Sequence, residues 1–119
     1  MTTMSMSQIF NKVSKHLLKQ NAKSMSDGDN CQYRSDEGLS CAVGCLMTDD
    51  MYDYSLEGEA VSSDQVVDAI APILGVQASK IEVKLDLLGE LQRIHDDFDV
   101  VEWEGLLAKV KVKLDYHIS

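Results

Sequence analysis

The chain lacks the features that mark a membrane-spanning or a secreted protein. Among its 119 residues there is no run of about 18 apolar residues, which argues against a transmembrane helix. Residues 1–8 contain neither the basic nor the apolar region of a secretory signal. Three cysteines are an odd number, in a chain too large to resemble a disulfide scaffold. We therefore expect reduced thiols and a cytoplasmic protein.

Basic residues are also scarce, because 11 lysines and arginines stand against 20 aspartates and glutamates, for a net charge of −9. Residues 1–25 carry four lysines and no acid, so the rest of the chain has 7 basic and 20 acidic side chains, a net −13. An acidic body repels phosphates, so we expect no binding of nucleic acid, and a partner protein with a basic surface is favoured. The alternative is that the acids only keep the protein dispersed in solution.

Apolar residues make up 45% of the chain, which predicts a single domain over residues 1–119 with its own core. Ser5 and Gln8 have the spacing of a capping box, and the apolar repeat behind them predicts a first helix over about 6–21. Another capping box, Ser62 to Gln65, precedes the next apolar repeat. The local pattern of both segments therefore indicates where a helix begins.

Pro72 lies inside that second repeat and is expected to kink or divide the helix, which Gly75 then ends. A third apolar repeat predicts a helix over 80–97, and the repeat that contains Trp103 predicts a final helix. Residues 110–114 alternate between apolar and basic, so a strand is the competing interpretation there.

The segments 31–34 and 39–41 flank a turn that ends at Gly38, which predicts a short β-hairpin. A four-residue loop over 35–38 would place Cys31 and Cys41 on opposite faces, whereas a three-residue loop would place them on the same face. The predicted fold class is α+β. It is a mostly helical domain in which an N-terminal helix is followed by the hairpin and by three or four helices packed around it.

The cysteines carry the sharpest hypothesis of enzymatic activity. Cys41 or Cys45 would attack a substrate, His95 would take the thiol proton, and Asp96 or Glu59 would orient the imidazole ring. Nothing in the spacing requires these side chains to meet. Buried free cysteine is common because the thiol packs as a small hydrophobe, so a structural role is the simpler interpretation. His95 near a helix C-terminus has an equally simple explanation, since that position favours partial positive charge.

A zinc site is a third interpretation, in which Cys31, Cys41 and Cys45 are joined by His16 or His95. The intervals match no zinc-binding pattern, so we expect no metal and no cofactor. A further possibility is oxygen coordination of a divalent cation by the acidic residues that follow the cysteines, but their order departs from that of an EF-hand. These residues are Asp49, Asp50, Asp53, Glu57 and Glu59.

A binding surface is predicted around the same segment. Arg34 is expected to pair with one of the acids that follow and so to pin the hairpin to the next loop, a geometry that suits the planar guanidinium. Tyrosine rings offer contact area to a partner at small entropic cost. The candidate binding residues are Tyr33, Arg34, Asp49, Tyr52, Glu57 and Glu59.

These segments resemble a family of small uncharacterised proteins from tailed phages and bacteria. The matching residues cover nearly the whole chain, and the departure is Met47-Thr48, where such proteins often have Ile-Pro. The resemblance implies a phage or prophage accessory protein in the bacterial cytoplasm, and it implies no particular activity. The matching elements are Gln8-Ile-Phe-Asn-Lys-Val13, Cys31-Gln-Tyr-Arg34, Gly38-Leu-Ser-Cys-Ala-Val-Gly-Cys-Leu46, Asp49 with Tyr52, Glu57-Gly58, Leu91-Gln-Arg-Ile-His-Asp96 and a last helix with tryptophan.

The sequence thus favours a non-enzymatic phage accessory protein that binds or inhibits a host or defence protein, with takeover of the host or evasion of its defences as the context. The alternative is a small cysteine-dependent hydrolase or transferase that uses the Cys/His/Asp arrangement. The pH dependence of thiol alkylation separates the two, because a catalytic thiol reacts well below its ordinary pKa of about 8.5.

Overall fold

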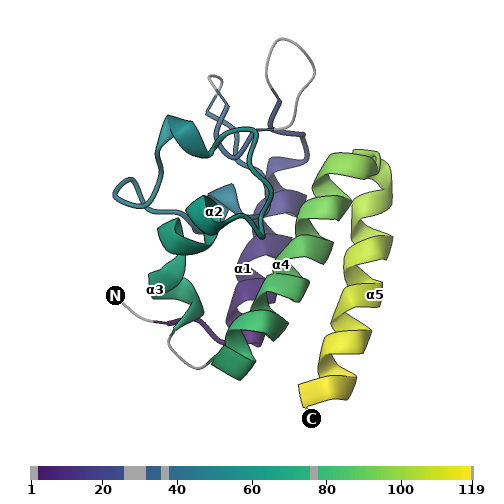
Figure 1. Cartoon of the computed structure of the whole chain (residues 1–119). Helices are drawn as coiled ribbons and strands as arrows, with labels where there is room; N and C mark the ends of the chain where they lie inside the picture. Colours follow the sequence, from purple (N-terminus) through teal and green to yellow (C-terminus); the bar gives the residue numbers. More distant parts are fainter. Residues whose placement is uncertain (1–2, 26–31, 36–37, 76–77, 119) are drawn as a thin grey trace.

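Three long helices form the body of the molecule in the computed structural model, which describes residues 3–25, 32–35, 38–75 and 78–118. Helices α1, α4 and α5 pack against one another, and the irregular chain between α1 and α2 lies beside them (Figure 1). Helix α3 contacts α4. The elements are α1 (Met6–Gln20), the 3-10 helices η1 (Gly44–Leu46) and η2 (Tyr54–Leu56), α2 (Asp64–Ala69), α3 (Ala71–Leu74), α4 (Ala78–Asp97) and α5 (Val100–Ile118).

Helix α1 confirms the expectation drawn from its capping residues. The Ser5 hydroxyl accepts a hydrogen bond from the Gln8 N–H, and the Gln8 side chain accepts one from the Ser5 N–H, so the capping box is complete. The helix ends at Gln20, one residue before the predicted end, where Asn21 takes the left-handed conformation. Its buried face consists of Ile9, Phe10, Val13 and Leu17.

Pro72 divides the second helical segment as predicted. Helix α2 ends at Ala69 and α3 begins at Ala71, with the proline in the first turn of α3, where its missing N–H costs no hydrogen bond. The start differs from the prediction by one residue, because Ser63 caps α2 by accepting from the Val66 N–H. Gly75 ends α3 with a φ of +85°, a conformation that glycine adopts without strain.

Helices α4 and α5 cover the two regions in which long apolar repeats were recognised. Residues 110–114 are helical, so the competing strand interpretation was wrong. Trp103 and Leu88 are fully buried, and the buried apolar side chains of the described residues join in one cluster. Between two helices that bury such stripes, van der Waals packing and removal of apolar surface from water supply most of the stability.

The α+β fold class and the β-hairpin were wrong. Among residues 32–35 and 38–41, only an isolated antiparallel bridge joins Arg34 to Ser40, and no strand occurs in the described part of the chain. The Cys41 N–H donates to the Tyr33 carbonyl at 3.2 Å, which is the pairing of the three-residue loop. Cys31 lies outside the described residues, so the face it occupies is not defined.

The pairing does not extend beyond this bridge, because the backbone groups of the next ladder bond have other partners. The N–H groups of Tyr33 and Arg34 donate to the Glu57 carboxylate at 2.8 and 3.1 Å. On the other arm, the Ser40 N–H donates to the Gln20 side chain, which returns a bond to the Ser40 carbonyl. Arg34 and Ser40 face each other as a non-hydrogen-bonded pair, so these outward groups are free for such acceptors. The next bond of the ladder would join the Tyr33 N–H to the Cys41 carbonyl. Glu57 takes the N–H and the Cys45 N–H takes the carbonyl, so the pairing stops after one bridge.

Close backbone packing then replaces the ladder. A Cβ built at Gly44 would overlap the Tyr33 carbonyl oxygen, so η1 lies directly against the backbone of the 32–35 segment. Glycine is the residue that permits this approach. Cys41, Ala42 and Val43 are fully buried beside it, which joins the irregular segment to the helical core.

None of the helices in the described part of the chain combines the length and the apolar character that a crossing of the bilayer requires.

Candidate functional site

The two described cysteines lie at η1, and both are reduced. Cys41 is fully buried, and its Sγ accepts a hydrogen bond from the Gly44 N–H at 3.3 Å. Cys45 is half-buried and donates its thiol proton to the Ala42 carbonyl at 3.1 Å. Burial raises the pKa of Cys41 to about 12 and the pKa of Cys45 to about 12. Both groups therefore remain thiols at neutral pH.

His95 is fully buried on α4, and both of its ring nitrogens have partners. Nδ1 lies 2.7 Å from an oxygen of the Asp96 carboxylate, and Nε2 lies 2.9 Å from the backbone nitrogen of Ser24. A backbone N–H can only donate, so Nε2 is the acceptor and Nδ1 carries the proton that is donated to Asp96. The Trp103 ring stacks on the imidazole at a centroid distance of 5.6 Å.

Gln92 extends this network to the cysteine-bearing segment. Its side-chain oxygen accepts from the Val43 N–H at 3.0 Å, and its amide nitrogen donates to Asp96 at 2.9 Å. One turn of α4 therefore bonds two backbone groups of the irregular chain, Ser24 N–H and Val43 N–H, through His95 and Gln92. Buried backbone groups need such partners, and here α4 side chains supply them.

Glu57 is the second organising residue. Its carboxylate accepts from the N–H groups of Tyr33 and Arg34 and from the Tyr52 hydroxyl, the last at 2.6 Å. Burial and the adjacent Glu57 raise the pKa of Tyr52. The Tyr33 hydroxyl donates to the Glu59 carbonyl at 2.6 Å, and burial raises the pKa of Tyr33. Hydrogen bonds to a charged acceptor are stronger than neutral ones, so Glu57 fixes the conformation of this segment.

Arg34 pairs with an acid of the following loop, as predicted. Its guanidinium donates to Asp49 at 2.9 Å and to the Met47 carbonyl at 2.9 Å, and it stacks over the Tyr52 ring at 4.8 Å from the centroid. The Asp49 side chain is 97% exposed, so solvent screens this ion pair and its contribution to stability is small. The bond to Met47 and the ring contact position the guanidinium.

The candidate metal ligands do not converge. Among the described residues no group of three or more histidine, cysteine or acidic side chains has the arrangement of a metal site. Asp53 caps η2 instead, and the hydrogen bonds from Ser55 lower the pKa of its carboxyl. His16 bonds to the Ser40 carbonyl. The zinc hypothesis also needs Cys31, which lies outside the described residues.

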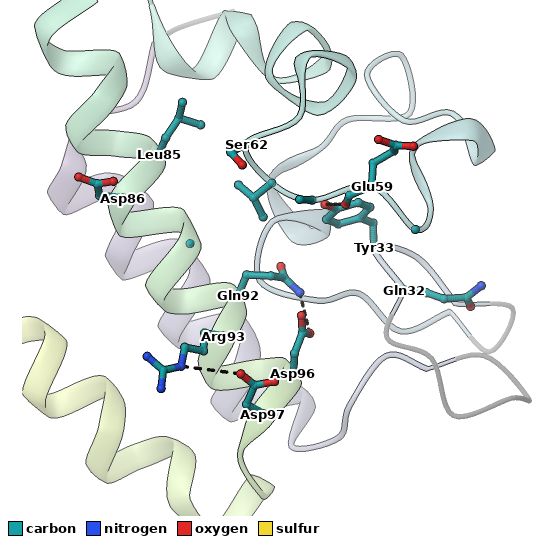
Figure 2. Close-up of a pocket in the computed structure, with 14 residues that line it drawn as sticks. Gln32, Tyr33, Glu59, Ser62, Leu85, Asp86, Gln92, Arg93, Asp96 and Asp97 are labelled. Atoms are coloured by element: carbon teal, nitrogen blue, oxygen red, sulfur yellow. Dashed lines mark hydrogen bonds and ion pairs between the residues drawn. The ribbon is translucent and has the colours of Figure 1, made fainter.

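An open pocket of about 670 Å³ lies between α4 and the segments 32–33 and 58–62. Figure 2 shows Gln92, Asp96 and Asp97 on the α4 side and Tyr33 and Glu59 across from them. Gln92 and Asp96 thus belong both to the internal network and to the wall of the pocket. The ionisable side chains that line it are Glu59, Asp86, Asp96, Asp97, Arg93 and Tyr33.

Charge in the pocket is mostly negative, because four of these side chains are carboxylates and one is basic. Arg93 lies 3.7 Å from Asp97, one turn along the helix, and its guanidinium also lies 5.9 Å from the centre of the Phe98 ring. Glu59 and Asp86 take part in no ion pair with a described residue. Gly58 and Gly89 contribute no side chain, and a Cβ at either would meet nothing within 4 Å.

The structure therefore brings some of the predicted residues into contact, but in two separate groups. His95 and Asp96 are bonded, and Tyr33, Arg34, Tyr52 and Glu57 form one cluster. Sequence reasoning missed Gln92, Ser24 and the α4 wall of the pocket. A signal was present, because Gln92 and His95 are two polar residues that interrupt the apolar stripe of α4 three positions apart.

Comparisons of the chain with protein-family models, with curated proteins and with solved structures found no match.

Proposed function

We propose that this chain is a non-enzymatic accessory protein of a phage or prophage, which acts in the bacterial cytoplasm by binding a host or defence protein through the acidic pocket beside α4. The phage context rests on the resemblance of the sequence alone. The observation that carries the binding role is the pocket itself: four carboxylates and one arginine line an open space of about 670 Å³.

The state of the cysteines and of His95 supports a non-enzymatic role. A general base must be able to accept the proton of the nucleophile, and the acceptor nitrogen of His95 already bonds to the Ser24 N–H. A nucleophilic cysteine needs a lowered pKa, whereas burial raises the pKa of Cys41 and of Cys45 to about 12. The two thiols and the imidazole instead form hydrogen bonds with backbone groups of the irregular chain between α1 and α2 and hold that chain in place.

The chemistry of the pocket favours a lysine or arginine side chain of the partner. A cation placed between Glu59 and the acids of α4 would face negative charge on both sides. The apolar side chains of Leu85 and Val61 would contact the aliphatic part of the lysine or arginine side chain. The two glycines leave room for the partner backbone to approach. Net charge of the same sign over most of the chain would speed the encounter with a basic surface.

An NMR titration with hexa-arginine as the probe tests this role. We expect shifts that centre on the amides of Gly58 and Gly89, and we expect them to weaken as salt is added. The double variant Glu59→Gln/Asp97→Asn should reduce the affinity at least about fivefold, because two charges of the pocket are lost. The matched control Glu82→Gln/Asp50→Asn removes two exposed acids elsewhere and should leave it unchanged.

Shifts spread evenly over the acidic surface, or an equal loss of affinity in both double variants, would contradict a role for this pocket. Pull-down from a host lysate with the same three proteins then identifies the partner. A host protein that is retained by the wild type and the control but lost from the pocket variant is the expected result.

A further inference from the structure

The outward face of α5 carries an apolar stripe that no described residue of the chain covers. Val101 is 89% exposed and Val112 is 69% exposed, and Gly105 and Ala108 between them are exposed as well. The intervals of four, three and four residues place all of them on one side of the helix. The core stripe lies on the opposite side and consists of Trp103, Leu107, Val110 and Leu114.

Contacts within the chain do not explain why a glycine stands at position 105. It lies inside a 19-residue helix, where glycine is less favourable than alanine, and a Cβ at this position would meet nothing within 4 Å. Its φ is not in the left-handed region, so the backbone does not require glycine either. A small residue at the middle of an exposed helix face allows a second helix to approach closely.

Charges flank the stripe in an ordered way. Glu102 and Glu104 lie on either side of its first half, and Lys109 and Lys111 lie on either side of its second half. On a helical projection, Glu102 and Lys109 share one flank, while Glu104 and Lys111 share the other. Lys111 also bonds to Asp115 in the next turn, at 3.0 Å.

We propose that α5 pairs with α5 of a second copy of this chain in antiparallel orientation, to form a symmetric dimer. Val101 then packs against Val112 of the second copy, and Gly105 packs against Ala108 of the second copy. In this register Glu102 faces Lys109 of the second copy, and Glu104 faces Lys111 of the second copy. Each contact occurs twice by symmetry, as an isologous interface requires.

The charge pattern favours a second copy of the chain as the partner of this face. The charges on the outward face of α5 are complementary to those of an identical helix only when the two helices are antiparallel. In a parallel pair the acidic halves would lie together and so would the basic halves, and the helix dipoles would be aligned unfavourably. The antiparallel pair sets each acidic half against a basic half. At the edge of the molecule, α5 has its outward side clear of α1 and α4 (Figure 1).

The dimer is expected to be weak, since one pair of helices buries less than the roughly 800 Å² per partner of a standard interface. Sedimentation equilibrium of the full chain should show a monomer–dimer equilibrium, with a Kd on the order of tens to hundreds of micromolar. A wild-type protein that remains monomeric up to about 1 mM would overturn the proposal.

Two charge variants test the register. Glu102→Lys/Glu104→Lys makes the flanks entirely basic, and Lys109→Glu/Lys111→Glu makes them entirely acidic, so each alone should dimerise at least about tenfold more weakly. An equimolar mixture of the two should recover dimer, because basic flanks now face acidic ones. The matched control Lys12→Glu/Lys15→Glu makes the same change of charge on the exposed face of α1 and should dimerise about as well as the wild type, because these residues lie outside the α5 interface.

Circular dichroism melting verifies that each variant is folded before its sedimentation is compared. A mixture that shows no more dimer than its components, or a control that loses dimer equally, would contradict the α5 interface.

Disulfide capture tests the orientation separately. Val101→Cys mixed with Val112→Cys should form a mixed disulfide between the two positions under mild oxidation, and neither variant should link to itself efficiently. Disulfides between two copies of Val101→Cys would instead demonstrate parallel helices. Tryptic mass spectrometry distinguishes these products. Cys31→Ser and Cys45→Ser in both variants remove the natural thiols other than the fully buried Cys41.

Discussion

The helical bundle and the irregular segment 38–63 are held together by different means. In the bundle, long apolar stripes on α1, α4 and α5 bury one another, and the described polar side chains other than Lys84, Gln92 and His95 are exposed or half-buried. In the irregular segment, the Val43 N–H donates to the side chain of Gln92 and the Ser40 N–H donates to that of Gln20. The N–H groups of the adjoining residues 33–34 donate to the side chain of Glu57. Stability of the bundle is thus spread over many contacts, whereas the irregular segment depends on a few acceptors.

This difference teaches where substitutions act. A lost methylene in the bundle costs free energy according to the cavity it leaves. Loss of an acceptor side chain beside the irregular segment leaves a backbone N–H without a hydrogen-bond partner, and we expect the segment to open without unfolding of the bundle. The predictions below are arranged by the expected size of the effect.

Trp103→Ala should have the largest effect, because the indole is fully buried at the centre of the bundle and stacks on His95. Removal of a buried tryptophan costs about 3–5 kcal/mol of unfolding free energy. Urea denaturation followed by circular dichroism measures this. Val101→Ala on the same helix, at an 89% exposed position, serves as the control and should change the stability of the dilute protein by less than about 0.5 kcal/mol.

The buried Cys41 thiol should make the fold sensitive to alkali. Burial raises its pKa to about 12 in the folded state, above the ordinary value of 9.0, so the unfolded chain loses the proton first. Stability from this group is complete below about pH 9 and falls as the pH rises toward 12, by about 4 kcal/mol in total. Urea midpoints of wild type and Cys41→Ala between pH 7 and 11 should converge as the pH rises.

The same burial predicts slow alkylation. Iodoacetamide at pH 8 should modify Cys41 in the folded protein far more slowly than in urea, as read by mass spectrometry. Rapid alkylation of Cys41 in the folded state at pH 7 would contradict its role in holding the irregular chain in place.

Glu57→Gln should loosen the irregular segment by about 1–3 kcal/mol, because one amide oxygen replaces a carboxylate that accepts three hydrogen bonds. Amide hydrogen exchange should accelerate at Tyr33 and Arg34, while the amides of α1 keep their protection. Glu59→Gln is the control, since only the backbone carbonyl of Glu59 bonds to the segment. Equal acceleration throughout the protein would show that the two regions are not independent.

Substitution of alanine for two of the glycines should change the free energy of unfolding in opposite directions. Gly44→Ala places a methyl group against the Tyr33 carbonyl and should destabilise the protein by about 1–3 kcal/mol. Gly89→Ala lies in α4 with open space around the added carbon, so it should stabilise the protein by about 0.5–1 kcal/mol. Thermal melts of both variants measure the two shifts. A loss of stability in Gly89→Ala would indicate that α4 is packed at a place where the structure leaves it open.

Much of the helical bundle could be predicted from the sequence, because the signals are local. The Ser5 and Gln8 capping box, the division at Pro72 and the apolar stripes of α4 and α5 each depend on residues within a few turns. The pairing of Arg34 with one of the acids that follow it was also predicted, and Asp49 is the partner in the structure.

The irregular segment could not be predicted, because its acceptors come from distant positions. Glycine and alternating residues over 31–41 indicate a hairpin as long as the backbone groups are free to pair. Glu57 takes the Tyr33 N–H, the Cys45 N–H takes the Cys41 carbonyl, and Gln92 takes the Val43 N–H from 49 residues away. Periodicity marks Gln92 and His95 as polar positions on the apolar stripe of α4, but it does not identify the distant backbone groups to which they bond, so the pocket beside them was not predicted either.

The protonation of the His95 ring tests the central claim most directly, namely that α4 side chains hold the irregular chain between α1 and α2 in place by bonding to its backbone. Long-range ¹H–¹⁵N correlation spectra of the imidazole at neutral pH distinguish the two tautomers. The structure requires a proton on Nδ1, donated to Asp96, and a bare Nε2 that accepts from the Ser24 N–H. A ring with its proton on Nε2 would contradict the account, because that nitrogen would then face the Ser24 N–H as a second donor.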